Sequence, residues 1–304
     1  MDSTWSPRKL NPEKMKTTLI NFLTIFFLIG LISGSQFVMA QDEEEPDNRP
    51  VRAPFESVWL LDGQTVLVPN KGTFEFDIIH RFGTVGAGAS DLWGMYSPSN
   101  IRLGLSYTPI ENLTVGFGNT KDDDLLDFSV KYSIIKQTRS WSIPVSVTYF
   151  GNAVMDTGKE DHVDNGLQRW SYFHELIIAT RFNSKLSVQI APSFSHYNGV
   201  DSLYSNDVIS ASIKARYKLS PALAAIVGYD HPFTDHETTD LDLTPSLAFG
   251  LEIATSAHAF QIFLGNSRGI VPQRNAAYGE YGLTNGKFKD NFLIGFNITR
   301  LWNF

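Results

Sequence analysis

The chain has 304 residues, no cysteine, 42% hydrophobic and 13% aromatic positions, and a formal net charge of −7. The lack of cysteine excludes a disulfide-stapled miniprotein and a cysteine-ligated zinc or iron–sulfur protein, and the acidic balance argues against a nucleic-acid partner. The only continuously apolar stretch, Leu19 to Ile32, has about 14 residues and falls short of the ~20 that a transmembrane helix needs.

Residues 1–40 have the layout of a signal peptide. Lys14 and Lys16 precede the apolar stretch, and the small-residue motif at 38–40 follows it, as a cleavage site would. Met15 is a candidate for the true start of the chain. An uncleaved anchor helix is the alternative, which the shortness of the apolar stretch disfavours.

Two short segments separate this region from the rest. Residues 41–54 begin with an acidic, proline-containing run that cannot bury a core, so we expect a disordered linker. Residues 55–72 are too apolar for a linker, with Phe55, Trp59 and the run 66–68, and they need a burial site. A plug inside a barrel or a cap under its periplasmic mouth would supply one. Packing as an additional strand or against a partner protein are the alternatives.

From residue 73 to residue 304 the chain divides into segments of about ten residues in which apolar side chains occupy alternate positions. This is the period of a strand whose two faces meet different surroundings. Twelve such segments are predicted, three of them (172–182, 222–229 and 259–265) from weaker patterns. The others are 73–82, 101–108, 113–118, 126–133, 141–149, 186–195, 209–218, 246–253 and 292–304.

The connections between these segments alternate in length. Brief ones are expected near residues 111, 137, 183, 220 and 256, and longer ones at 83–99, 119–123, 151–169, 197–206, 231–244 and 266–289. A soluble sandwich has no such bias, whereas transmembrane barrels have short periplasmic turns and longer outer loops. The sequence therefore predicts an all-β protein, a transmembrane antiparallel β-barrel of about 12 strands spanning 73–304, in the outer membrane of a Gram-negative cell.

The polar face of the predicted strands carries charged residues that lipid would reject at a cost of up to a few kcal/mol each. They are expected to line a wet or salt-bridged lumen. These candidates are Glu75, Asp77, Arg81, Arg102, Asp127, Lys131, Glu175, Arg181, Lys214, Arg216 and Glu252.

The last predicted strand ends in an aromatic residue and resembles the signal that the barrel assembly machinery recognises. The residues that carry this likeness share one parity: Phe292, Ile294, Phe296, Trp302 and Phe304. The expected partners are therefore outer-membrane lipid and the assembly machinery.

Several phrases of the chain resemble an uncharacterised β-barrel family, domain of unknown function family 5777. They are Ile79–Gly83, Asn100–Leu105, Asn112–Gly116, Pro144–Thr148 and Phe292–Arg300. The chain departs from the family pattern at Ser256-Ala257, where that pattern favours a glycine pair. The resemblance implies an outer-membrane barrel and no established activity.

No catalytic residue, cofactor or confident metal site is predicted. His174 has the outward parity of the catalytic histidine in outer-membrane phospholipases, which the chain resembles in strand number, but position 176 is Leu where a His-x-Ser arrangement needs serine. Asp230, His231, Asp235 and His236 are weak metal candidates because their spacing matches no fixed motif.

The leading hypothesis is a porin-like channel or transporter for small polar solutes, and not an enzyme, with selectivity set by lumen charges. If those charges pair completely, the barrel is closed, and the alternative is a structural or surface-interaction module that acts through its extracellular loops. A lipid-modifying enzyme is a distant third hypothesis.

Overall fold

A computed structural model describes residues 46–158, 166–200, 204–234, 244–255, 257–277, 283 and 288–303. Residues 47–304 form one compact unit, and residues 1–46 form a second, of which only Pro46 lies within the described part. The predicted signal peptide and most of the acidic run therefore lie outside the described residues. Among the described residues, no helix is both long and apolar enough to cross a membrane.

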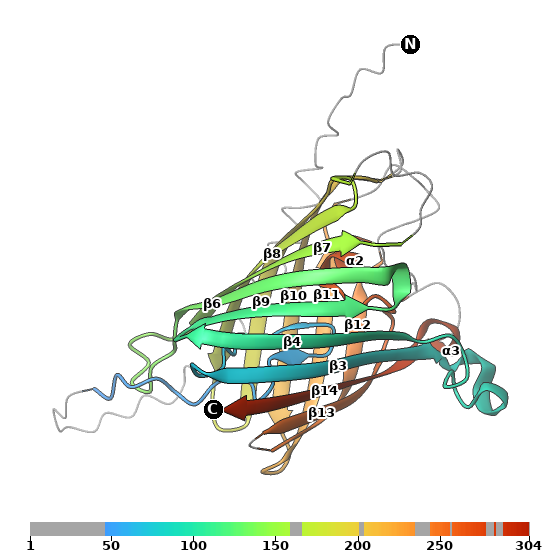
Figure 1. Ribbon diagram of the computed structural model, residues 1–304. Coiled ribbons are helices and arrows are strands. Elements are labelled where there is room, and N and C mark those ends of the chain that lie inside the picture. Colours follow the sequence, from blue (N-terminus) through green and yellow to red (C-terminus); the bar gives the residue numbers. More distant parts are fainter. Residues whose placement is uncertain are drawn as a thin grey trace. The chain divides into compact units, whose positions relative to one another are not determined.

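Twelve antiparallel strands close into a barrel (Figure 1), which confirms the predicted fold class. Each strand pairs with its neighbours in the chain, and the last strand pairs with the first, so that no edge strand is left with unpaired backbone groups. The strands are β3 (Thr73–Thr84), β4 (Asn100–Ile110), β5 (Leu113–Thr120), β6 (Leu125–Ile135), β7 (Ser146–Asp156), β8 (Trp170–Arg181), β9 (Leu186–Tyr197), β10 (Asp207–Lys218), β11 (Leu223–Pro232), β12 (Ser246–Ala254), β13 (His258–Gly265) and β14 (Leu293–Asn303).

The predicted start of the fifth barrel strand was wrong. Trp141 was expected to open it, but Trp141 has a left-handed φ of 61° in the connection before β7, which begins at Ser146. Pro144 explains the late start, because proline has no N–H to give to a strand ladder. At its other end β7 continues through residues 151–156, which were expected in a loop, because they pair with β6 as far as Leu125.

Burial alternates along the strands as the sequence pattern predicts. In β3 every second residue is buried, and the residues between are partly exposed. Large apolar side chains are exposed on the outer surface, such as Leu105 (50%), Phe128 (45%) and Ile262 (60%). An apolar outer face and a polar inner face are the arrangement of a barrel that lies in lipid.

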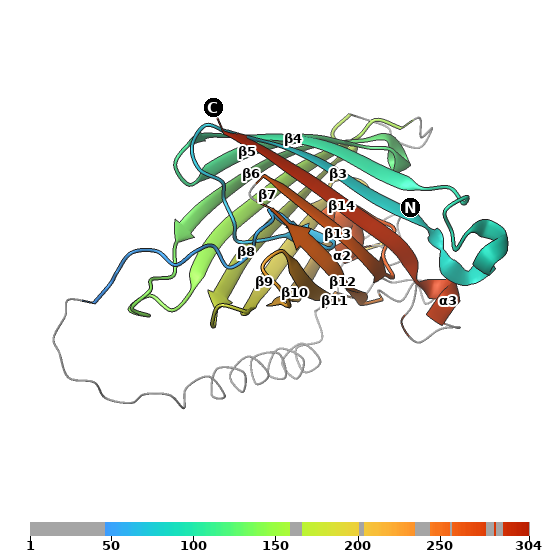
Figure 2. The same ribbon diagram turned by 90° about the horizontal axis from the view of Figure 1, so that it is seen from below.

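The two ends of the barrel differ, as Figures 1 and 2 show. The short-turn end has the connections 111–112, 136–145, 182–185, 219–222 and 255–257. The long-loop end has 85–99 with the 3₁₀ element η1 (Val85–Asp91), 121–124 with η2 (Asp122–Asp124), 157–169, 198–206, 233–245, and 266–292 with α2 (Pro272–Ala277) and α3 (Phe288–Asn291).

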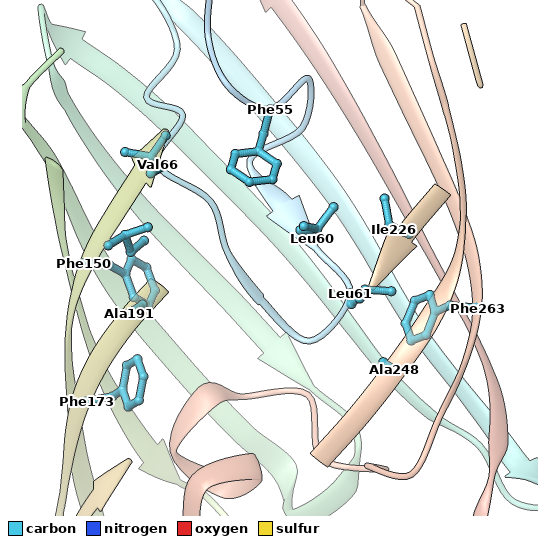
Figure 3. Packing of buried hydrophobic residues seen from close by; sticks show 12 residues of the cluster. Phe55, Leu60, Leu61, Val66, Phe150, Phe173, Ala191, Ile226, Ala248 and Phe263 are labelled. Carbon is cyan, nitrogen blue, oxygen red and sulfur yellow. The ribbon is translucent and has the colours of Figure 1, made fainter. Parts of the chain in front are cut away.

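Residues 55–67, here called the inner segment, lie inside the barrel (Figure 3). The short strands β1 (Trp59–Leu60) and β2 (Gly63–Gln64) pair with each other in a separate two-stranded sheet, so the segment is not an additional strand of the wall. Val58 and Trp59 pack in one buried cluster with Ile79 and Ile270, and the other buried apolar side chains of the segment form a larger cluster with inward-facing residues of the wall. The members of this cluster are Phe55, Leu60, Leu61, Val66, Phe150, Phe173, Ile177, Ala179, Ala191, Ile226, Ala248 and Phe263.

The chain before the inner segment is held at the short-turn end. Residues 47–51 lie along the β6–β7 connection: Val51 N donates to the Gln137 carbonyl (2.9 Å), and Arg139 N donates to the Arg49 carbonyl (3.0 Å). The Arg49 guanidinium, hydrogen-bonded to Asp47, holds the pKa of that carboxyl well below its usual value. The inner segment is therefore tethered on both sides, by this contact and by β3.

Candidate functional site

The lumen wall gathers the charged residues that the alternation singled out. Ten of the eleven candidates are no more than 6% exposed: Glu75, Asp77, Arg81, Arg102, Asp127, Lys131, Glu175, Lys214, Arg216 and Glu252. The eleventh, Arg181, has the same parity but lies at the short-turn end of β8, where it is partly exposed and donates to the carbonyls of Asn183 (3.3 Å) and Arg52 (3.4 Å).

Arg102 on β4 is the centre of the largest ion-pair group. Its Nη1 lies 2.5 Å from Asp77 Oδ1 on β3, and its Nε and Nη2 each lie 2.8 Å from the Asp127 carboxylate on β6. The Asp127 contact is bidentate, the strong and oriented form of a guanidinium–carboxylate pair. The guanidinium also lies 5.2 Å from the ring of Trp59, so the inner segment covers it.

Two glycines make room for this group. Gly104 on β4 and Gly118 on β5 are directly opposed in the ladder and have the inward parity. A Cβ at Gly104 would collide with the side chains of Asp77 and Arg102, and a Cβ at Gly118 with those of Arg102 and Asp127. The strand period places both glycines on the inner face, but it does not reveal what they accommodate.

Three further ion pairs lie in the lumen. Lys214 Nζ is 2.9 Å from Asp230, and Arg216 Nε is 2.6 Å from Glu252. Arg81 Nη2 is 2.7 Å from Asp62 of the inner segment. Asp62 was not among the predicted lumen residues, because it falls outside the alternating strands and no periodic signal marks it.

The wall holds the backbone of the inner segment through side-chain amides and hydroxyls. The donors come from β7, β9, β13 and β14, strands distributed around the barrel. Gln261 Nε2 donates to the Trp59 carbonyl (2.7 Å), Asn297 Nδ2 to that of Leu61 (2.8 Å), Gln189 Nε2 to that of Gln64 (2.8 Å) and Thr148 Oγ1 to that of Val66 (2.9 Å). These bonds satisfy carbonyl groups that would otherwise be buried without a partner.

Other buried polar groups of the wall have no protein partner among the described residues. Neither carboxylate oxygen of Glu75 has a hydrogen-bond partner, although the residue is only 1% exposed. The hydroxyls of Ser195, Ser212 and Ser246 likewise have no hydrogen-bond partner among the described residues. Two cavities of about 20 Å³ each, roughly the size of one water molecule, lie between the inner segment and the wall. One adjoins Glu75, and the other adjoins Lys214.

A larger cavity of about 400 Å³ opens at the long-loop end. Arg268 Nε lies 2.8 Å from Asp122 there, and Arg274 contacts Asp123. Its lining joins η2 to the loop that leads into α2: Asn100, Thr120, Lys121, Asp122, Asp123, Leu125, Arg268, Gly269, Ile270, Val271 and Arg274.

Those residues considered for metal or lipid chemistry that the structure describes are not brought into a site. Asp230 is paired with Lys214, His231 packs against the rings of Tyr229 and Phe233, and Asp235 and His236 lie outside the described residues. The described part of the chain contains no group of three or more metal-ligating side chains. His174 faces outward, with Nδ1 2.7 Å from the Tyr149 hydroxyl.

Three residues of the predicted assembly signal, Ile294, Phe296 and Trp302, lie on β14. Ile294 and Phe296 are partly exposed on the outer face, and the Trp302 ring lies 4.8 Å from the Arg300 guanidinium. Phe292 precedes the strand and is buried, stacked on Phe288 of α3 with ring centroids 4.1 Å apart. Phe304 lies outside the described residues.

The chain is similar, at low sequence identity, to solved structures that include two porins and an outer membrane channel. The match to the NanC porin covers 76% of this chain and 99% of the porin chain, at 10% identity and a TM-score of 0.44. The COG4313 outer membrane channel from Pseudomonas putida F1 covers 78% and 97% at 13% identity and a TM-score of 0.45. The KdgM porin covers 76% and 99% at 10% identity and a TM-score of 0.44.

No curated protein sequence matches the chain. Residues 55–302 match the family described as a membrane bound beta barrel domain, DUF5777. This match covers most of the chain, including the inner segment, and it agrees with the resemblance that the sequence phrases carry. The chain therefore belongs to the DUF5777 family of membrane-bound β-barrel domains.

Proposed function

We propose that this protein is a porin-like channel for small polar solutes in the outer membrane of a Gram-negative cell, and that the inner segment closes its lumen in the present conformation. The observation that carries the proposal is a barrel wall whose inner face is lined with charged and hydroxyl side chains while an apolar segment lies across it. Selectivity would come from the lumen charges, with no catalytic step.

The polarity of the wall favours a channel over a permanently dry barrel. In a closed core, nearly all buried polar atoms find hydrogen-bond partners. Here the Glu75 carboxylate and the Ser195, Ser212 and Ser246 hydroxyls have none among the described residues. Such groups are costly in a dry interior and are hydrated in a water-filled one.

The way in which the inner segment is held favours displacement within the lumen. Residues 47–51 are bound to the β6–β7 connection, and β3 follows at Thr73, so the segment cannot leave without breaking one of these attachments. Most of its polar contacts with the wall are single hydrogen bonds, each contributing roughly 0.5–1.5 kcal/mol net. Opening would break these hydrogen bonds and separate the apolar cluster, and water would hydrate the surfaces that become exposed.

A disulfide lock tests this proposal, because the chain has no cysteine of its own. The Ser57 hydroxyl of the inner segment lies 3.2 Å from the Thr299 hydroxyl of β14, so Ser57→Cys with Thr299→Cys places two thiols within bonding reach. We expect the oxidised variant, inserted in a planar bilayer, to be silent, and the reduced variant to open in discrete conductance steps.

A matched lock within the wall is the control. Thr108 and Thr114 face each other across the β4–β5 ladder with hydroxyls 2.8 Å apart, and a Thr108→Cys, Thr114→Cys bridge leaves the inner segment free. This variant should conduct whether oxidised or reduced. Equal conductance of the Ser57–Thr299 lock in both states would rule out the inner segment as the closing element. A folded, inserted barrel that never conducts would contradict the channel itself.

A second function is favoured by one loop. Trp93 (50% exposed), Met95 (43%) and Tyr96 (76%) are apolar or aromatic residues on the 85–99 connection at the long-loop end. Exposed apolar residues grouped in this way often mark an interaction surface. If the barrel proves silent, we propose instead a closed barrel that acts through its outer loops. Trp93→Ser with Tyr96→Ser should then abolish binding through the 85–99 connection without unfolding the barrel.

A further inference from the structure

We propose that the lumen passes small monovalent cations, including primary ammonium ions, in preference to anions, and that Glu75 and Glu175 are the residues that determine this preference. This inference rests on the proposed channel and names the class of solute that it admits. It is carried by the pairing of charges in the wall and by a buried carboxylate that has no hydrogen-bond partner.

Some of the buried lumen charges cancel one to one. Three basic groups each have a single carboxylate within 2.9 Å: Arg81 with Asp62, Lys214 with Asp230, and Arg216 with Glu252. These pairs add no net charge to the path. They therefore leave the selectivity to the remaining buried groups.

The remaining buried groups are not balanced. Among the described residues, Arg102 alone pairs with the two carboxylates Asp77 and Asp127, which leaves one negative charge in excess. Glu75 and Glu175 make no ion pair among the described residues. Glu75 lines one small cavity with Lys131, and Glu175 lines the other with Lys214, which is already paired with Asp230. Once the three pairs are set aside, four buried carboxylates (Glu75, Asp77, Asp127 and Glu175) remain for two bases (Arg102 and Lys131). Arg181 does not compensate them, because it lies at the short-turn end of β8.

Lys131 marks the position at which a cation would bind. It lines the same 20 Å³ cavity as Glu75, and its ammonium donates a hydrogen bond to Gln64 Oε1 of the inner segment, at 3.0 Å. When the inner segment moves, Lys131 loses that partner while Glu75 and Glu175 stay on the wall. The position of Lys131 therefore already suits an ammonium group. Because Lys131 is one base for two glutamates, one carboxylate is left for a mobile cation.

Glu75 supplies the independent observation. The residue is 1% exposed, lines the 20 Å³ cavity together with Asp77 and Lys131, and has no hydrogen-bond partner on either oxygen. A buried carboxyl group without hydrogen bonds stays neutral in a dry interior, and it ionises when water or a cation reaches it. Rings of acidic side chains produce cation selectivity in this way in other pores.

The test is the reversal potential of the mature protein in a planar bilayer under a potassium chloride gradient. We expect potassium to be preferred over chloride. Glu75→Gln and Glu175→Gln should each lower the permeability ratio by about fivefold, the Boltzmann weight of one unit charge acting across ~4 Å of water. Lys131→Met should raise the ratio, and Glu111→Gln, in an exposed turn at the short-turn end, should leave it unchanged.

The outcomes separate this inference from the channel on which it rests. A conducting barrel with a potassium-to-chloride ratio of one or less, or a ratio that does not respond to Glu75→Gln and Glu175→Gln, overturns the cation proposal and leaves the channel in place. A folded and inserted barrel that stays silent even when the Ser57–Thr299 lock is reduced overturns both.

Discussion

Arg102 illustrates how single residues of the wall depend on one another. It lies 25 positions from each of its partners, Asp77 and Asp127, and replacing it would leave those two carboxylates facing each other in a buried site. Removing one partner from a buried ion pair typically costs about 3–5 kcal/mol. We therefore expect Arg102→Gln to lower the unfolding free energy of the barrel in detergent by about that amount. A loss below about 1 kcal/mol would mean that water reaches these carboxylates in the closed state.

The opposed glycines of β4 and β5 give a second prediction at this scale. Gly104→Ala and Gly118→Ala would each force a Cβ into the Arg102 ion-pair group, and we expect a loss of about 1–3 kcal/mol, as for overpacked cores. Urea unfolding followed by tryptophan fluorescence measures it. Gly166→Ala is the control, since a Cβ there meets no atom within 4 Å. If all three variants were equally stable, the ion-pair group would have to be more adaptable than its geometry implies.

The burial of the charged strand residues could be predicted from the sequence, but their partners could not. The alternation within one strand is enough to place a charge on the inner face, whatever the neighbouring strands contain. Ten of the eleven candidates are buried there. Pairing depends on register between strands, as for Arg102 with Asp127, and on a segment outside the repeating pattern, as for Arg81 with Asp62. Asp230 was considered as a metal ligand because it begins a run rich in aspartate and histidine, and nothing in that run indicates its pairing with Lys214.

At the scale of elements, the inner segment is a separate unit that the wall supports. Leu60 and Leu61 are fully buried, and Leu61 has a left-handed φ of 56° at the turn between β1 and β2. Leu60→Ala should weaken docking of the segment by about 2–5 kcal/mol, the cost of a buried leucine truncation. Hydrogen exchange should then become faster at amides of residues 58–66 and stay unchanged in the barrel strands.

The matched control is Leu167→Ala at the long-loop end, where the side chain is 72% exposed and truncation should have no effect on the inner segment. Equal acceleration of exchange in the segment and in β7 and β13 would indicate that segment and barrel open together. In that case the segment would be part of the barrel core, and the proposed opening would require loss of the wall.

The strands themselves were predictable because each has two faces in different solvents. The exceptions have local causes: Pro144 delays β7, and pairing with β6 extends it to Asp156. The inner segment could be recognised as needing burial from Phe55, Trp59 and Val66. Its place could not be derived, because burial in the lumen, under it or against a partner would satisfy the same composition.

At the scale of the whole molecule, the difference between the two ends predicts the orientation of the barrel in a membrane. The long-loop end contains η1, η2, α2 and α3, whereas most connections at the short-turn end are four residues or fewer. The first barrel strand starts and the last strand ends at the short-turn end (Figures 1 and 2). Barrels of this kind have their short turns in the periplasm. We therefore expect the long-loop end to face the outside of the cell.

Single cysteines test this orientation without background labelling, since the chain has none. Tyr96→Cys lies on the 85–99 connection at a site that is 76% exposed, and Glu111→Cys lies in the exposed turn between β4 and β5. A membrane-impermeant maleimide added to intact cells should label the first variant, and should label the second only after the outer membrane is permeabilised. The reverse pattern would place the cavity lined by Arg268 and Asp122 on the periplasmic side. It would also place the short-turn end, where the inner segment is tethered, on the outside of the cell, so that solutes would enter the barrel from that end.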